Sequence, residues 1–261
     1  MMGKQVNTGK LIPSLMAVDV TEKKLSILLT SIKFEIIYQD NWLLPKLESE
    51  NTWSWEIGGR IATSFIQDKK PYYALAIAVG YPGIIDSGNG VIFDPRGNGT
   101  FKNFHITDII RRHIDTPVAV IDRVQATFHG AVNLNKNQYK NDALFIYFED
   151  EFCISTIKVN GLYFPGDSLR FRKQSPGHDI VLDKDQLSKK IFELANSLEL
   201  KKIYIHSEKP LILVDEIITT LNEWERKINV TRPVIKEDAT LMGLIDIAAS
   251  IAHENQTVIF Q

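Results

Sequence analysis

One apolar run constrains the fold of this chain more than any other stretch: Ala74-Leu-Ala-Ile-Ala-Val-Gly-Tyr-Pro-Gly-Ile-Ile-Asp86. A run without a solvated face predicts a central strand that is buried on both sides. It ends in Gly80, Pro82 and Gly83, and glycine lets another group approach the backbone closely. Because ligands of α/β folds bind at such strand ends, the run predicts an α/β protein with a ligand-side turn. A core strand closed by an ordinary turn is the alternative interpretation.

Composition narrows the class of protein. The 261 residues allow one large domain or two of ordinary size, and a net charge of −2 gives no basic footprint for nucleic acid. Cys153 is the single cysteine, which excludes an intrachain disulfide and a cysteine-rich zinc site. No signal peptide and no run of about 18 apolar residues is evident, so a cytoplasmic protein without membrane contact is predicted.

The order of elements predicts two linked α/β halves, because strands followed by a helix occur twice. The predicted hinge lies near residues 115–117. Strands are predicted over 15–20, 25–29, 32–38, 74–79, 116–121, 143–148, 152–159 and 202–206, with a hairpin turn at Asn160-Gly161, and helices over 53–66, 105–112, 124–132, 183–198, 211–228 and 238–252.

Several segments resemble, in order, motifs of the ROK family of sugar kinases and sugar-responsive repressors, which has the actin-like ATPase fold. Ile77-Ala-Val-Gly-Tyr-Pro-Gly-Ile-Ile-Asp86 looks like the family's GIGVPGPVD segment. Pro117-Val-Ala-Val-Ile121 resembles the strand before its END catalytic motif, and Leu144-Phe-Ile-Tyr-Phe148 the strand before its GTGIGGG phosphate loop. Ser175-Pro-Gly-His178 is similar to the end of its GEIGH motif, and residues 239–249 to its closing helix.

This resemblance implies two actin-like (ribonuclease H-like) α/β lobes with a cleft between them. The lobes would comprise residues 1–116 and 117–237, and a C-terminal helix over 238–261 would return to the first lobe. A homodimer and a small sugar ligand are further expectations from the family.

The proton-transfer residues depart from the family pattern. The family uses a carboxylate to take the proton from a sugar hydroxyl. Alignment without gaps places Asp122 at the asparagine of the END motif and Arg123 at its catalytic aspartate. An arginine stays protonated and cannot act as a general base. A slip of one residue would instead make Asp122 the base.

The phosphate loops depart from the pattern as well. The first should read Asp-x-Gly-Gly-Thr, but here it reads Asp19-Val-Thr-Glu-Lys23, so Asp19 alone remains as a weak cofactor-binding candidate. The acidic run Glu149-Asp-Glu151 stands in the second loop and would repel a triphosphate. A solvated acidic turn is the favoured interpretation of that run, with a divalent-cation site as the alternative. The adenosine loop lacks its glycines and reads His206-Ser-Glu-Lys-Pro210.

The segments that would contact a sugar keep more of the family's polar residues than the phosphate loops do. Asp94, Asn98 and His178 are the substrate-binding candidates, and a histidine that only holds a loop is the alternative interpretation of His178. No metal ligand set is predicted, because the family's zinc-binding cysteine cluster is missing after His178.

These departures predict a ROK-type protein that has lost ATP-dependent phosphotransfer and acts as a binding, regulatory or assembly module, with no cofactor. One alternative is an active hexose kinase with atypical loops, which would use Asp122 as base and bind ATP and magnesium. The other is a sugar-responsive transcriptional regulator without a DNA-binding domain of its own.

Overall fold

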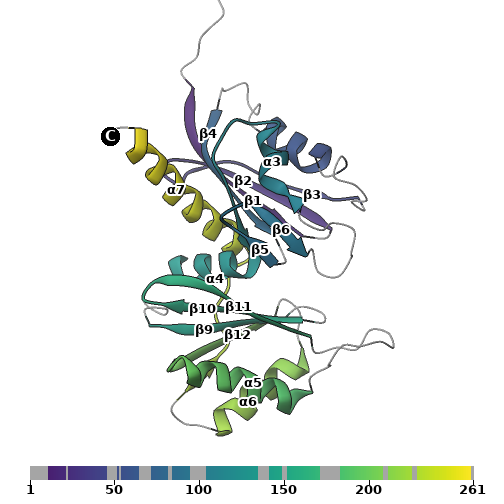
Figure 1. The fold of residues 1–261 in the computed structure, drawn as a ribbon, viewed down its shortest axis with the longest axis vertical. Coiled ribbons are helices and arrows are strands. Elements are labelled where there is room, and N and C mark those ends of the chain that lie inside the picture. The colour runs from purple at the N-terminus through teal and green to yellow at the C-terminus, as the bar shows by residue number, and fades with distance from the viewer. Residues whose placement is uncertain are drawn as a thin grey trace, which may run out of the picture. The chain divides into compact units, whose positions relative to one another are not determined.

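The computed structural model describes residues 11–21, 23–45, 52, 54–64, 72–81, 84–94, 104–134, 141–148, 152–170, 183–207, 211–224 and 228–259 (Figure 1). The chain divides into two compact units. The first unit comprises residues 1–126 and 240–261, and the second comprises residues 127–239. None of the helices in these described ranges is long and apolar enough to span a membrane.

A mixed five-stranded sheet forms the centre of the first unit. Its strand order is β3-β2-β1-β4-β8, with β1 and β2 antiparallel, β2 and β3 antiparallel, and β4 and β8 parallel to β1. The predicted central strand is confirmed as β4, which lies between β1 and β8. The bounds are β1 Ile12–Val20, β2 Lys24–Ser31, β3 Ile36–Leu43, β4 Tyr72–Tyr81 and β8 Val118–Asp122.

Helical segments cover both faces of this sheet, as Figure 1 shows. On one face lie η1 (Ser54–Gly59), α2 (Arg60–Ser64) and α3 (Ile106–Arg111), whose isoleucines pack on Val18 and Val79. On the other face α7 (Ala239–Ile259) packs Leu244 and Ala248 against alanines of β1 and β4. Small side chains on that face leave room for the helix to lie close to the sheet.

A small antiparallel sheet follows β4 in the first unit. It consists of β5 (Ile84–Asp86), β6 (Val91–Asp94) and β7 (Phe104–His105). In the turn between β5 and β6, Asp86 Oδ1 accepts the N–H of Gly88 at 3.0 Å, and Gly90 adopts φ +65° against Thr107. A side chain at position 90 would collide with Thr107, so this turn requires glycine.

The second unit repeats the strand arrangement of the first. Its sheet has the order β11-β10-β9-β12-β13, in which the first three strands are antiparallel and β12 and β13 run parallel to β9. The hairpin turn at Asn160 and Gly161 is confirmed, with φ values of 52° and 81°. The bounds are β9 Ala143–Phe148, β10 Phe152–Val159, β11 Leu162–Arg170, β12 Lys202–Ser207 and β13 Asn229–Thr231.

Successive side chains of β9 point to opposite faces of the second sheet, and helices cover both faces. Leu144 and Ile146 pack with α5 (Lys184–Ser197) and α6 (Ile212–Trp224). On the other face Phe145 stacks on Phe128 of α4 (Arg123–Leu134), with ring centroids 4.6 Å apart. In Figure 1, α4 lies on one side of this sheet and α5 and α6 lie on the other.

Several element boundaries differ from the sequence prediction, and two of the differences have a structural reason. The third strand begins at Ile36 rather than at residue 32, because Ser31 closes a turn. Its hydroxyl accepts the N–H groups of Lys33 and Glu35, and Phe34 takes φ 65°. The helix predicted over 211–228 is α6, whose described part ends at Trp224, and residue 228 is already outside it, directly before the edge strand β13 (Asn229–Thr231).

Tyr38 on the edge strand β3 is expected to titrate far above an ordinary tyrosine. Burial and then the hydrogen bond to Asp40, at 3.1 Å, raise its pKa from 10.0 to about 12. The stabilisation from the protonated phenol is therefore complete below pH 10 and is lost as the pH rises from 10 to 12. The ultraviolet difference between wild type and Tyr38→Phe should show a tyrosinate midpoint near pH 12.

Asp40→Asn is the control for this titration. It should lower the Tyr38 midpoint only in part, because burial, the largest single cause of the raised pKa, remains. A wild-type midpoint near pH 10 would contradict the environment described for Tyr38.

Candidate functional site

Three parallel strands of the first unit end side by side. In the register of β1, β4 and β8, Asp19 lies beside Gly80, and Gly80 lies beside Ile121. The helix α4 begins directly after β8, at Arg123. The carboxyl ends of β1, β4 and β8 therefore bring together residues that are about 100 positions apart in the sequence.

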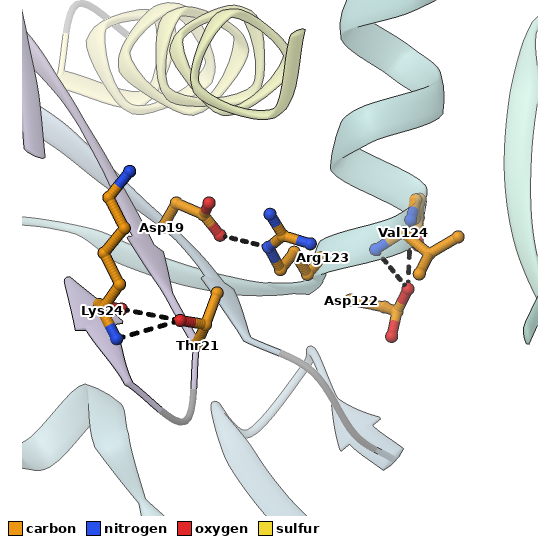
Figure 2. A network of polar contacts seen from close by, with 7 residues as sticks. Asp19, Thr21, Lys24, Asp122, Arg123 and Val124 are labelled. Carbon is orange, nitrogen blue, oxygen red and sulfur yellow. Dashed lines mark hydrogen bonds and ion pairs between the residues drawn. The ribbon is translucent and has the colours of Figure 1, made fainter. Parts of the chain in front are cut away.

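An ion pair joins the first and last of these strand ends, as Figure 2 shows. The Nε of Arg123 donates to Oδ1 of Asp19 at 2.8 Å. The side chains of Arg123 and Asp19 are only 13% and 10% exposed. A charge-assisted hydrogen bond between largely buried groups is strong and directional, so it fixes the guanidinium at the end of β1.

Gly80 allows this strand end to be packed tightly. A side chain added there would place its Cβ 3.0 Å from Cδ1 of Leu244 and 3.7 Å from Oδ1 of Asp19. The first of these distances is shorter than most Cβ contacts, so any larger residue would displace the α7 side chain. Gly80 thus lets α7 approach the sheet beside the Asp19 carboxylate.

Asp122, the alternative candidate base, holds the start of α4 instead of pointing at Asp19. Its Oδ1 accepts the N–H of Val124 at 2.8 Å and that of Gln125 at 3.0 Å. This is the arrangement of a helix N-cap, in which a side chain satisfies N–H groups of the first turn. In Figure 2 the carboxylate turns back toward the backbone of α4, away from Asp19.

Asp122→Ala is expected to lower the free energy of unfolding by about 1 kcal/mol, because two N–H groups lose their acceptor. Asp122→Asn should cost much less, since asparagine is as good an N-cap as aspartate. Urea denaturation of the two variants measures the difference. Equal losses in both variants would contradict the capping role.

Backbone groups and the Thr21 hydroxyl bond to one another in the turn between β1 and β2. The N–H of Thr21 donates to the carbonyl of Lys24 at 2.8 Å, and the Lys24 N–H donates to Oγ1 of Thr21 at 3.0 Å. The carbonyl of Lys23 accepts the N–H of Leu44 at 2.9 Å. The N–H groups of Thr21 and Lys24 are therefore directed into the hairpin rather than outward to a phosphate. Figure 2 shows the contacts of Lys24 with the Thr21 hydroxyl.

The remaining candidates are described only in part. Asp94 is the last residue of β6, where its backbone pairs with Ile84, and its side chain lies outside the described part of the structure. Asn98, His178 and the acidic run from Glu149 to Glu151 also lie outside the described residues. Within the described part, no group of three or more His, Cys, Asp or Glu residues could hold a metal ion.

The pairing of Arg123 with Asp19 is the feature that sequence reasoning missed. The alignment placed an arginine at a catalytic position but did not assign it a partner. A signal was present, because Asp19 and Arg123 carry opposite charges at the ends of β1 and β8, the two strands that flank β4. The order of the strands in the sheet was the information needed to use that signal.

Comparison with known proteins identifies the fold. No family model and no curated protein sequence matches the chain. Several solved structures of ROK family sugar kinases and regulators match nearly all of it, at low sequence identity. The chain thus has the α/β fold of two mixed five-stranded sheets that the two-lobed actin-like ROK proteins share.

Three of these structures illustrate the kinds of protein that share the fold. A ROK family transcriptional regulator, a homologue of the E. coli MLC protein, matches with a TM-score of 0.71 and 12% identity over 96% of this chain and 82% of its own. The ROK hexokinase of Thermus thermophilus matches with a TM-score of 0.65 and 13% identity, over 94% of this chain and 99% of its own. A ROK glucokinase of Streptomyces griseus was solved with glucose and AMPPNP. It matches with a TM-score of 0.63 and 12% identity, over 91% of this chain and 99% of its own.

Proposed function

We propose that this chain binds a small sugar without transferring phosphate to it, and that it acts as a binding, regulatory or assembly module. The observation that carries the proposal is the ion pair of Arg123 with Asp19. It occupies the place where the resemblance to ROK kinases puts a catalytic carboxylate and the aspartate of the first phosphate loop.

The chemistry of the pair supports the loss of phosphotransfer. A general base must accept the proton of a sugar hydroxyl, and a guanidinium that is already protonated has no lone pair to offer. The nearest carboxylate along the chain, Asp122, is engaged by two N–H groups at the start of α4. Hydrogen bonds to Oδ1 stabilise the carboxylate anion, so it is a weaker acceptor for a proton.

Magnesium and ATP are a poor fit to the described residues. A magnesium ion prefers oxygen ligands from one or two carboxylates together with phosphates. Oδ1 of Asp19 instead accepts a hydrogen bond from a cationic side chain, and a second cation beside it would be repelled. The hairpin after β1 directs the N–H groups of Thr21 and Lys24 inward, where a phosphate cannot reach them.

The sugar part of the proposal rests on the polar candidates Asp94, Asn98 and His178, together with the fold. The glucokinase of Streptomyces griseus has the same fold and was solved with glucose. A transcriptional regulator has the same fold over 96% of this chain, so the fold is compatible with a regulatory use. Function is still carried by the site rather than by the fold, so binding has to be measured directly.

A thermal-shift panel tests the proposal. Wild-type protein is heated with hexoses, sugar phosphates, and ATP with magnesium, since only molecules that bind the native state raise the melting temperature. We expect at least one sugar to raise it and Mg-ATP to leave it unchanged. Asn98→Ala and His178→Ala should reduce the sugar response, with Asn41→Ala, at an exposed position of β3, as the control. A rise with Mg-ATP as large as that with sugar would contradict the proposal.

A further inference from the structure

The turn between β2 and β3 presents five consecutive exposed residues, 32–36. Three of them are large and apolar, namely Ile32, Phe34 and Ile36. The same end of the first sheet, where β1 and β4 begin, carries an exposed leucine and an exposed tyrosine, at positions 11 and 73. Single apolar residues are ordinary on a protein surface, but a group of them at one place is typical of an interaction site.

Phe34 occupies a backbone position that suits glycine. Its φ is 65°, in the left-handed region, and its N–H donates to the carbonyl of Ser31 at 2.9 Å. The N–H of Ser31 donates to the carbonyl of Glu35 at 2.9 Å, so residues 32–34 form the loop of this hairpin. The last residue of such a loop is usually glycine, because a side chain there costs free energy. An exposed phenylalanine gives the fold little in return for that cost, so the fold alone does not account for it.

The order of the residues makes the segment complementary to itself. It reads Ile32-Lys-Phe-Glu-Ile36, with an isoleucine at each end, a phenylalanine in the middle and opposite charges between them. When two copies meet about a two-fold axis at Phe34, each Lys33 faces the partner's Glu35, and isoleucine faces isoleucine. Both charged side chains are exposed and can reach a second copy. Such a contact has two ion pairs around an apolar centre.

We propose that residues 32–36 are a self-association surface, through which two copies of this chain form a reversible dimer. The complementary charges select a second copy as the occupant, because a different partner would not require the segment to match itself. The contact is smaller than a standard interface, which takes about 20–30 residues from each side, so the dimer forms at micromolar concentrations and dissociates on dilution. The inference goes beyond the proposed function, because it involves no sugar.

Sedimentation velocity of the full chain, over a range of protein concentrations, tests the inference. Lys33→Glu and Glu35→Lys each put like charges opposite each other, so each single variant should weaken the dimer about tenfold or more. The double variant Lys33→Glu/Glu35→Lys restores opposite charges across the two-fold axis, and it should dimerise as wild type does. Both positions are exposed, so folding of these variants is not at stake.

Phe34→Gly separates the self-association surface from the fold. Glycine adopts the left-handed φ without strain, so the dilute variant should melt close to the wild-type temperature, whereas its dimerisation weakens about tenfold. Phe164→Ala on β11 is the matched control. It removes a phenylalanine of nearly equal exposure, 45% against 46%, and should leave the dimer unchanged.

Three results would overturn the inference. Wild type that stays monomeric at high micromolar concentration has no self-association surface, and the exposed segment then serves another partner or none. A dimer that Phe34→Gly leaves intact forms elsewhere on the chain. A double charge variant as weak as the single variants means that Lys33 and Glu35 do not face each other across the axis. The thermal-shift panel with sugars tests the proposed function separately, so failure of one can be told from failure of the other.

Discussion

Replacing Arg123 with alanine is expected to lower the free energy of unfolding by about 3 kcal/mol. The substitution takes the counter-charge from a carboxylate that is only 10% exposed. Removing one partner of a buried ion pair costs far more than the pair itself contributes, because the remaining charge has lost its water and its partner. Urea denaturation of the full chain, followed by a probe in the first unit, measures the loss.

Arg232→Ala provides the matched comparison. Its pair with Asp215 is shorter, at 2.6 Å, but largely exposed, so we expect a loss below about 1 kcal/mol. Asp19→Asn/Arg123→Gln should recover most of the stability lost in Arg123→Ala, because neither position then carries a charge. Similar losses in Arg123→Ala and Arg232→Ala would show that the Asp19 pair is not effectively buried.

Phe128→Ala should lower the free energy of unfolding of the second unit by about 4 kcal/mol. The ring is fully buried, stacks on Phe145, and meets Tyr163 edge-on with centroids 5.7 Å apart. Truncation removes the transfer free energy of the ring and leaves a cavity between α4 and the sheet. A probe in the second unit, such as hydrogen exchange of the β9 amides, should report the loss.

Phe164→Ala on β11 is the control for that prediction, because its side chain is 45% exposed. We expect it to cost less than about 1 kcal/mol. A loss below 1 kcal/mol in Phe128→Ala would mean that α4 does not cover this face of the second sheet.

Most of the fold could be predicted from apolar patterning. The continuous apolar runs predicted β4 and β9, and the Asn160-Gly161 pair predicted the turn between β10 and β11. The turn at Ser31 could not be predicted, because it depends on Phe34 taking a positive φ that phenylalanine rarely adopts. The short strand β13 was missed because its three residues carry too little pattern to separate them from a loop.

The candidate site could be predicted only in part. Alignment singled out Asp19, Asp122 and Arg123, but residue types alone do not say which side chain faces which. Alternation along β8 settles this, because Asp122 follows Ile121 and the two point to opposite faces of the sheet. Asp122 therefore caps α4, while Arg123 reaches Asp19.

Release of ADP from Mg-ATP in the presence of a panel of hexoses tests the central claim most directly. With an arginine paired to Asp19, we predict no sugar-dependent release from wild-type protein. Asp122→Asn keeps the N-cap and removes the rival base, so it is the variant that separates catalysis from folding. Sugar-dependent turnover by wild type that Asp122→Asn abolishes would contradict the account and identify an active kinase.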